Sequence, residues 1–193
     1  MSPTLNELFE KYKSVDCTYG TDKITSHSYG ELYSNALSNY SKPVVLEIGY
    51  YSGASMVVWS EFFPESIIYG IDISLDKLSF GKELPNIKHY LLDGTIDNAP
   101  EKLNELKGNN DKYDIIIEDA SHTPESQVKT FELFGPTLNK GGVYIIEDIN
   151  EIYADQVKSG LEILVQNYSM RMEWHDLRHI KNRFDDIVAV IYN

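Results

Sequence analysis

The stretch VVLEIGYYSGAS, residues 44–55, contains the signals of a strand, a turn and a helix in direct succession. A short apolar run holds one acid, Glu47, and ends at Gly49, as expected for a buried strand that enters a turn. Gly49 allows a sharp turn, and Gly53 allows a ligand to approach the backbone. A helix that begins near Ala54 offers free N–H groups at its N-terminus. The stretch therefore predicts a ligand site between a strand and a helix.

Further apolar runs along the chain also end in acids. They are IIYGID at Asp72, HYLLD at Asp93, YDIIIED at Asp119, and GVYIIED at Glu147 and Asp148. In an open parallel sheet, ligands bind at the carboxyl ends of the strands. We therefore expect these carboxylates to form an acidic rim around one crevice.

Strand and helix patterns alternate from residue 43 onward, which is typical of βαβ units in a parallel sheet. The predicted strands are 44–48, 67–72, 87–92, 113–118 and 142–147, and the predicted helices are 4–13, about 30–39, 54–63, 76–83, 98–107, 125–138 and 152–166. The strand-like runs SMRMEWHDL (169–177) and DDIVAVIYN (185–193) predict a closing antiparallel hairpin. We expect an α/β fold with a mostly parallel, seven-stranded sheet and helices on both faces. Residues 1–193 are expected to form a single domain, with 1–40 as an N-terminal helical or lid segment.

Composition excludes several classes of protein. The 193 residues carry a formal charge of −13, and the 17 Lys and Arg residues are scattered, which argues against a nucleic-acid partner. The N-terminus lacks a signal-peptide pattern, and no apolar run approaches the roughly 20 residues that span a bilayer. The single cysteine, Cys17, allows no intrachain disulfide and receives no catalytic role. We expect a cytoplasmic protein without membrane association.

The acid that precedes the glycine turn indicates which cofactor binds there. A carboxylate at Glu47 would repel a pyrophosphate but would favour a cationic group such as the sulfonium and ammonium of S-adenosylmethionine. Asp72 is the expected acceptor for the ribose hydroxyls, and Asp93 is expected at the adenine edge. The full set of predicted cofactor-binding residues is Glu47, Gly49, Tyr50, Gly53, Ser55, Asp72, Asp93 and Asp119. A Rossmann dehydrogenase is disfavoured because the GxGxxG turn is missing.

Asp119 and the pair Glu147-Asp148 end neighbouring predicted strands, so their side chains should converge. Converging carboxylates repel one another, and a hard, oxygen-preferring cation such as Mg²⁺ relieves that repulsion. Alternatively, these acids only cap the helices that follow them.

Several motifs extend over most of the chain. They are Gly20-Thr-Asp-Lys23 with His27 and Tyr29, Leu46-Glu-Ile-Gly49, Asp119-Ala-Ser-His122, Thr130-Phe131, residues 141–148, Asp176-Leu-Arg178 and Arg183-Phe-Asp-Asp186. On these motifs the chain resembles the class I S-adenosylmethionine-dependent methyltransferases, with their Rossmann-like fold, over about residues 40–193. More narrowly, it is similar to the macrocin and mycinamicin-type sugar O-methyltransferases, a group with relatives in cephalosporin biosynthesis.

The resemblance implies a site for Mg²⁺, or another divalent cation, at Asp119, Glu147 and Asp148. It also implies that His122 is the catalytic base, with Asp119 as its catalytic partner. The expected reaction is Mg²⁺-assisted methyl transfer to a hydroxyl of a sugar or related small polyol. A homo-oligomer is left open as a further expectation.

Two alternatives stay open: a metal-independent small-molecule methyltransferase, and a non-catalytic S-adenosylmethionine-binding module. The sequence departs from the family at Ser126, where many relatives carry a histidine, and at residues 149–153, so the acceptor can differ. Residues 20–33 are either a lid over the cofactor or a solvated connector.

Overall fold

The computed structural model describes residues 3–14 and 19–193, so Cys17 lies outside the described residues. The strands are β1 Val44–Ile48, β2 Ile67–Asp72, β3 Ile87–Leu91, β4 Tyr113–Glu118, β5 Leu138–Ile146, β6 Arg171–Asp176 and β7 Ile187–Tyr192. The α-helices are α1 Leu5–Lys11, α2 Gly30–Leu37, α3 Ala54–Phe62, α4 Ala99–Lys107, α5 Pro124–Phe134, α6 Ala154–Tyr168 and α7 Arg178–Lys181. Two 3₁₀ turns, Gly135–Thr137 and Glu151–Tyr153, precede β5 and α6.

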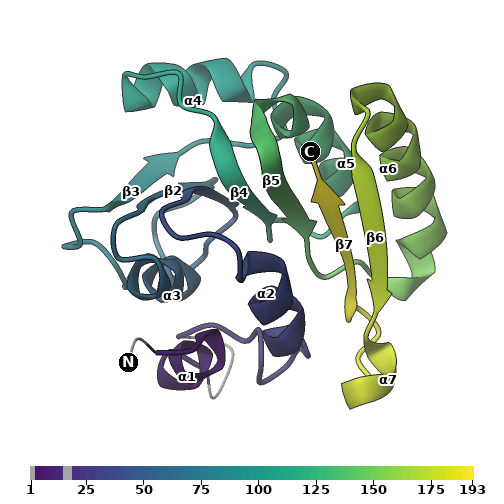
Figure 1. Ribbon diagram of the computed structural model, residues 1–193, viewed down its shortest axis with the longest axis horizontal. Coiled ribbons are helices and arrows are strands. Elements are labelled where there is room, and N and C mark those ends of the chain that lie inside the picture. Colours follow the sequence, from purple (N-terminus) through teal and green to yellow (C-terminus); the bar gives the residue numbers. More distant parts are fainter. Residues whose placement is uncertain (1–2, 15–18) are drawn as a thin grey trace.

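The strands form one sheet in the order β3-β2-β1-β4-β5-β7-β6 (Figure 1). β1 to β5 pair parallel with one another, whereas β7 pairs antiparallel with both β5 and β6. The predicted mostly parallel sheet with a C-terminal antiparallel hairpin is therefore confirmed. The strand order reverses between β1 and β4, which is the point where open α/β sheets bind ligands.

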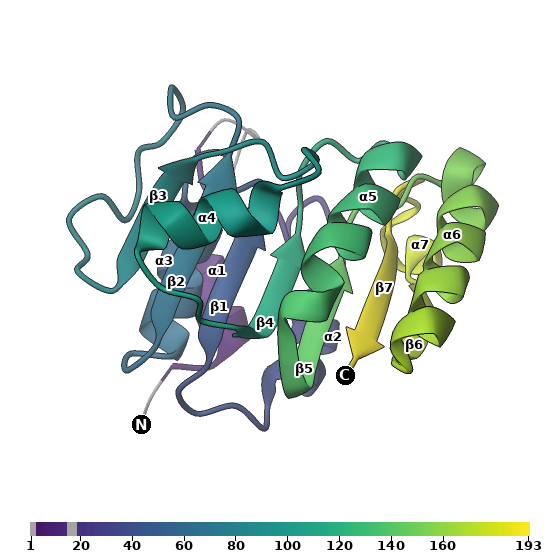
Figure 2. The same ribbon diagram turned by 90° about the horizontal axis from the view of Figure 1, so that it is seen from above.

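Helices cover both faces of the sheet (Figure 2). On one face, α1, α2 and α3 pack against alternate strand residues such as Val45, Ile115 and Ile117. On the other face, α4, α5 and α6 pack against the residues between them, such as Leu46 and Ile116. Successive side chains of a strand point to opposite faces, so strands that are apolar at every position need cover on both sides.

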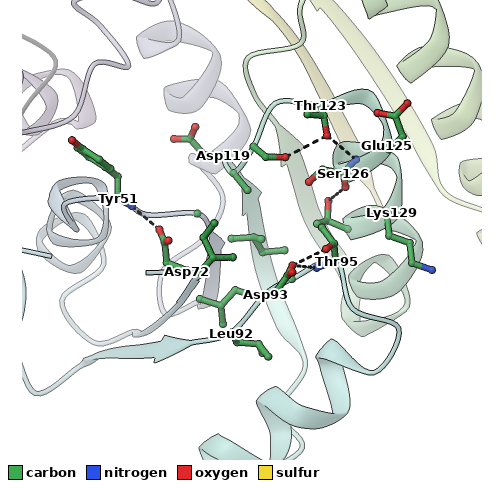
Figure 3. Close-up of a pocket in the computed structure, with 18 residues that line it drawn as sticks. Tyr51, Asp72, Leu92, Asp93, Thr95, Asp119, Thr123, Glu125, Ser126 and Lys129 are labelled. Carbon is green, nitrogen blue, oxygen red and sulfur yellow. Dashed lines mark hydrogen bonds between the residues drawn. The ribbon is translucent and has the colours of Figure 1, made fainter. Parts of the chain in front are cut away.

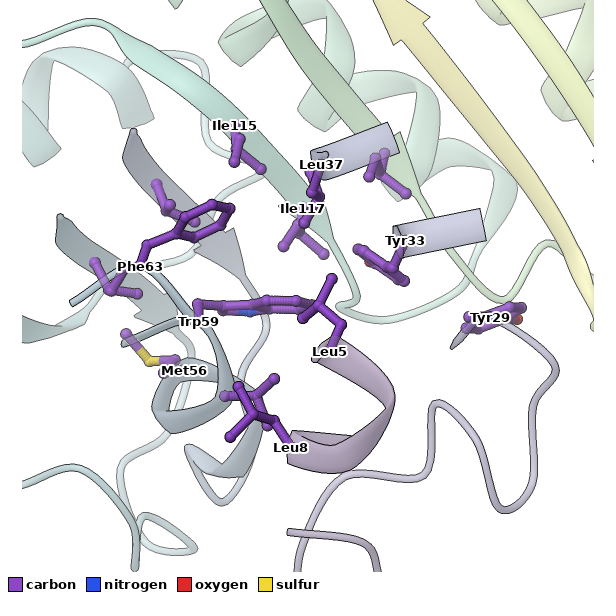
Figure 4. Close-up of a cluster of buried hydrophobic side chains, with 14 of the residues drawn as sticks. Leu5, Leu8, Tyr29, Tyr33, Leu37, Met56, Trp59, Phe63, Ile115 and Ile117 are labelled. Atoms are coloured by element: carbon purple, nitrogen blue, oxygen red, sulfur yellow. The ribbon is translucent and has the colours of Figure 1, made fainter. Parts of the chain in front are cut away.

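The N-terminal helices are part of the first of these cores (Figure 4). Thr4 caps α1, since its hydroxyl accepts a hydrogen bond from the Glu7 N–H and the Glu7 carboxylate accepts one from the Thr4 N–H. Phe9 is fully buried and makes edge-to-face contacts with Tyr33 and Trp59 at centroid distances of 6.0 and 5.6 Å. These contacts fix α1 against α2 and α3 on this face of the sheet.

The predicted helix at 76–83 is wrong: residues 73–86 form turns and bends. The backbone N–H groups of Ser79 and Phe80 both donate to the carbonyl of Ser52, a pattern that a helix cannot provide. Gly81 follows with φ +75°, which also ends any helical run. The other predicted elements are present, with ends shifted by up to four residues. Among the described residues, no helix is both long and apolar enough to cross a membrane.

Replacing Phe9 by alanine should lower the free energy of unfolding by about 3–5 kcal/mol, because it empties a fully buried aromatic site between three helices. Urea denaturation followed by circular dichroism measures the change. Phe184→Ala is the matched control, since Phe184 is 51% exposed, and it should stay within about 0.5 kcal/mol of the parent. Equal effects of the two substitutions would contradict the assignment of α1 to the core.

Candidate active site

Two adjoining cavities lie at the carboxyl edge of β1, β2 and β4. The larger has a volume of about 740 Å³ and the smaller about 320 Å³. Gly49, Tyr51, Asp119 and Ala120 line both cavities, so these residues form the boundary between them. The larger volume is in the usual range for a small-molecule site.

The larger cavity is apolar on its floor and acidic at its rim (Figure 3). Ile48, Ile71 and Leu92 contribute apolar surface, while Asp72 and Asp93 project carboxylates from the ends of β2 and β3. Asp93 accepts hydrogen bonds from the N–H and the hydroxyl of Thr95 at 2.9 and 2.6 Å, and these bonds lower its pKa. Both acids therefore lie at the carboxyl edge of the sheet, as the strand pattern predicted, and their contacts with a cofactor stay predictions.

Asp72 also organises the glycine turn. Its Oδ2 atom accepts hydrogen bonds from the N–H groups of Tyr50 and Tyr51 at 3.1 and 3.0 Å. Gly49 has φ +79°, and a Cβ atom there would lie 2.4 Å from the carbonyl oxygen of Asp119. The turn thus depends on a glycine at this position and on a carboxylate at the end of the next strand.

The predicted residues of this turn divide into two groups. Tyr50 and Ser55 line the smaller cavity together with Gly49. At Gly53, by contrast, the space that a Cβ would take is filled by the carbonyl of Phe80 at 2.8 Å. Its φ of +83° positions the start of α3.

Glu47 is fully buried and lines neither cavity. Its Oε2 accepts a hydrogen bond from the Trp59 indole N–H at 3.0 Å. Burial raises the pKa of Glu47 to about 7, against the opposing effect of the Lys23 ammonium. Its predicted contact with the cofactor stays a prediction.

The smaller cavity holds the chemistry-bearing groups. His122 Nε2 lies 4.0 Å from Asp119 Oδ1 and 3.9 Å from Asp148 Oδ2. One ligand-type atom from each of these residues lies within 4.8 Å of the other two, a spacing that suits one metal ion. His122 Nδ1 is buried without a hydrogen-bond partner among the described residues.

Neighbouring charges and burial shift the pKa values of Asp119 and Asp148 in opposite directions. The Lys23 ammonium and the His122 ring hold the pKa of Asp119 below its usual value, although burial opposes them. Burial and the negative charge of Asp119 raise the pKa of Asp148 to about 7. A cation between the two carboxylates would relieve this repulsion, so the donor set fits a divalent ion.

Glu147, the third predicted ligand, has a different environment. Its Oε2 atom accepts a hydrogen bond from the Lys23 ammonium at 2.6 Å, and its Oε1 atom accepts one from the Tyr33 hydroxyl. The prediction that Glu147 binds a metal is not tested by this geometry and stays a prediction.

Sequence reasoning assigned no role to Lys23, Tyr29 or Tyr33, although the first two lie in the quoted motifs. Lys23 Nζ donates to Asp119 Oδ2 at 2.8 Å, and the Tyr29 hydroxyl donates to Asp148 Oδ1 at 2.6 Å. The only available signal was the density of polar and aromatic residues in 20–33, which suggested a lid. Lys23, Tyr29 and Tyr33 are buried, so a solvated connector is excluded for these positions.

Comparison with known proteins gives three concordant findings. A family model described as a methyltransferase domain matches residues 46–149. Demethylmacrocin O-methyltransferase of Streptomyces fradiae is 34% identical over 78% of this chain and 38% of its own length. 8-Demethyl-8-alpha-L-rhamnosyl tetracenomycin-C 2'-O-methyltransferase of Streptomyces olivaceus is 30% identical over 70% of this chain and 36% of its own length. The chain thus spans little more than a third of these relatives.

Among solved structures, the chain is similar to the methyltransferase MycE from the mycinamycin biosynthetic pathway, determined in complex with Mg, SAH and mycinamycin VI. The TM-score is 0.70 at 23% identity, over 99% of this chain and 54% of that one. At this identity the likeness concerns the fold.

Glu118 offers a test of the electrostatics beneath the site. It is fully buried, and burial together with the charge of Asp119 raises its pKa to about 8. The folded protein therefore retains a proton that the unfolded chain releases near pH 4.5, so this residue costs stability as the pH rises from about 5 to 8. Glu118→Gln should reduce the stability lost between pH 5 and pH 8 by about 3 kcal/mol.

Urea denaturation at the two pH values measures this difference. Glu105→Gln, at an exposed position of α4, is the control and should leave the pH dependence of the parent unchanged. A Glu118→Gln protein with the same pH dependence as the parent would contradict the raised pKa.

Proposed function

The chain belongs to the methyltransferase-domain family, as its resemblance to the sugar O-methyltransferases predicted, and on this premise we propose that it transfers a methyl group from S-adenosylmethionine to a hydroxyl of a sugar or related small polyol, assisted by Mg²⁺. The observation that carries the proposal is the convergence of Asp119, His122 and Asp148 in a cavity that opens into the larger one. The names of the relatives describe O-methyltransferases, one of them of a rhamnosyl tetracenomycin.

The cofactor is assigned to the larger cavity. Asp72 would accept hydrogen bonds from the ribose hydroxyls, and Asp93 would accept one from the adenine amino group. Apolar surface from Ile71 and Leu92 would cover the ring. The methionyl part would extend past Gly49 and Tyr51 into the smaller cavity, because these residues line both.

The acceptor hydroxyl is assigned to the smaller cavity, beside His122. An alcohol is a weak nucleophile near neutral pH, so its proton has to be removed as the methyl group is transferred. A divalent cation held by Asp119 and Asp148 would lower the pKa of the acceptor hydroxyl and orient it. Mg²⁺ prefers oxygen ligands, which leaves the His122 imidazole free to take the proton.

Positioning supplies much of the remaining rate. Binding in the two adjoining cavities would bring the sulfonium and the hydroxyl together, and ordering two reactants in this way avoids a large entropic cost. Asp119 lines both cavities, so the same side chain, whose Oδ1 lies 4.0 Å from His122 Nε2, would also border the cofactor.

Cofactor binding is tested by calorimetric titration with S-adenosylhomocysteine. Asp72→Ala should weaken binding by about tenfold or more, because it removes the ribose acceptor and releases two N–H groups of the turn. Asp76→Ala, at an exposed position four residues later, should bind like the parent. Absence of binding by the parent protein would refute the cofactor assignment, and unchanged affinity of Asp72→Ala would refute the ribose role.

The role of His122 is tested by His122→Ala, which should retain cofactor and Mg²⁺ binding while transfer slows by about 10²–10⁴-fold, as expected for loss of a general base. Methyl transfer to a panel of glycosides provides the rate, and titration provides the affinities. His179→Ala, on the exposed surface of α7, is the control. Undiminished turnover would remove His122 as the base, and turnover in EDTA equal to that in Mg²⁺ would favour the metal-independent enzyme.

A further inference from the structure

His89 lies on β3, and the proposed reaction makes no use of it. Both of its ring nitrogens are buried without a hydrogen-bond partner among the described residues. Buried polar atoms of folded proteins are nearly always paired, so an unpaired imidazole needs an explanation. The His89 ring contacts the Tyr50 ring at a centroid distance of 5.1 Å, and Tyr50 lines the smaller cavity. His89 therefore packs against the glycine turn.

The same imidazole contacts residues 73–86, the β2–β3 loop, which connects β2 to the edge strand β3 (Figure 1). A Cβ atom at Gly81 of this loop would lie 3.6 Å from His89 Nε2. A Cβ atom at Gly53 of the glycine turn would lie 3.6 Å from His89 Cε1. The absence of a side chain at both glycines lets the two segments approach one ring from different sides.

The β2–β3 loop is closed onto the glycine turn by backbone contacts. The N–H groups of Ser79 and Phe80 both donate to the carbonyl of Ser52 at 3.0 Å. The Phe80 carbonyl fills the space beside Gly53. Ser52 lines the smaller cavity, and Ile73 of the loop lines the larger one. The loop thus supports the turn that borders both cavities.

The surroundings of His89 disfavour a positive charge on its ring. Tyr50 faces the ring from the glycine turn, and its hydroxyl is also buried without a partner among the described residues. Burial lowers the pKa of His89; the Gly81 backbone opposes this shift, and the charge of Lys82 adds to it. The imidazole is therefore neutral at neutral pH. The charged side chains on the elements around it are Asp72 of β2, Glu61 of α3, Lys88 of β3, and Asp76, Lys77, Lys82 and Glu83 of the loop.

The acids in this set are engaged elsewhere or exposed. Asp72 accepts hydrogen bonds from N–H groups of the glycine turn, and Glu61 accepts them from Lys11 and Tyr12. Asp76 and Glu83 are exposed. A proton on His89 would thus place a charge between the loop and the turn with a lysine as the charged group that acts on it.

We propose that His89 is a positioning residue for the cofactor, whose neutral imidazole closes the β2–β3 loop onto the glycine turn and whose protonation in acid opens the loop. This inference rests on the proposed function, since the cofactor is assigned to the cavities that the turn borders. A histidine whose pKa is lower in the closed loop than in the open one takes up a proton on opening. The closed loop is therefore fully stable above the ordinary histidine pKa of about 6.5 and loses stability as the pH falls below it.

Amide hydrogen exchange of Ser79 and Phe80 measures the opening, because both N–H groups bond to Ser52 in the closed loop. After correction for the intrinsic effect of pH on exchange, their protection should fall by about three- to tenfold from pH 7.5 to pH 5.5, relative to amides of the central strand β4. The upper bound is set by an open state with an ordinary imidazole, which is protonated about ten to one at pH 5.5.

His89→Phe separates the charge from the packing. Phenylalanine keeps a planar ring against Tyr50 but takes up no proton, so the protection of the two amides should no longer fall in acid. His179→Phe, on the exposed surface of α7, is the matched control and should keep the pH dependence of the parent. The same fall in His89→Phe as in the parent would overturn the inference. If His89→Phe does not fold, NMR titration of the parent decides, and a His89 pKa at or above about 6.5 would overturn it.

A second arm tests the link to the cofactor at pH 7.5. If the closed loop is the form that binds, S-adenosylhomocysteine at ten times its dissociation constant should raise the protection of the Ser79 and Phe80 amides about tenfold. Binding that leaves this protection unchanged would overturn the inference while the proposed function stands. If the parent binds no S-adenosylhomocysteine, the proposed function and the link to the cofactor both fail, whereas exchange in the parent and in His89→Phe still decides whether His89 closes the loop.

Discussion

The burial of several carboxylates at one edge of the sheet is the constraint on which the rest of the site depends. The strand ends bring Glu47, Asp119 and Glu147 around a single point, and a low-dielectric interior makes their mutual repulsion costly. The Lys23 ammonium is the group that offsets it, because it contacts two of these carboxylates and lies near the third. The converging carboxylates are thus held together by a cation that belongs to the chain itself.

This requirement explains why the N-terminal segment is fixed to the far end of the chain. His27 Nδ1 lies 2.7 Å from Asp186 Oδ1, and the Lys181 ammonium donates to the His27 carbonyl at 2.6 Å. Tyr29 stacks on His27 at a centroid distance of 4.8 Å and reaches Asp148. Removing one partner of such a buried network leaves the other polar groups unpaired, which costs more free energy than replacing the whole network by apolar side chains. The network therefore specifies one arrangement of the N-terminal segment more than it adds net stability.

Local patterns were sufficient to predict the sheet and the positions of the acids. Apolar runs that end in Asp72, Asp93 and Asp119 predict parallel strands, and the structure places each acid at a strand end or within two residues after it. The 76–83 segment was mispredicted because its N–H groups bond to Ser52, which is distant in sequence. The role of Lys23 was equally out of reach, since its partners lie 96 and 124 residues away and no local period encodes that pairing.

Backbone strain distinguishes the smaller cavity from an ordinary surface cleft. Tyr51, His122 and Asp148 adopt positive φ values of 45°, 55° and 53°, and all three line this cavity. Each such residue costs on the order of 1–3 kcal/mol and persists only where neighbouring contacts impose it. Here the Asp72 carboxylate accepts a hydrogen bond from the Tyr51 N–H, and the Tyr29 hydroxyl donates one to the Asp148 carboxylate.

The other described non-glycine residues with positive φ have an ordinary explanation. Ser169 and Asn182 are the C-caps of α6 and α7, where this conformation is common. The strained residues of the smaller cavity do not cap a helix, and they lie around the His122 imidazole and the carboxylates of Asp119 and Asp148. This placement is consistent with a site that is organised for chemistry at the expense of local stability.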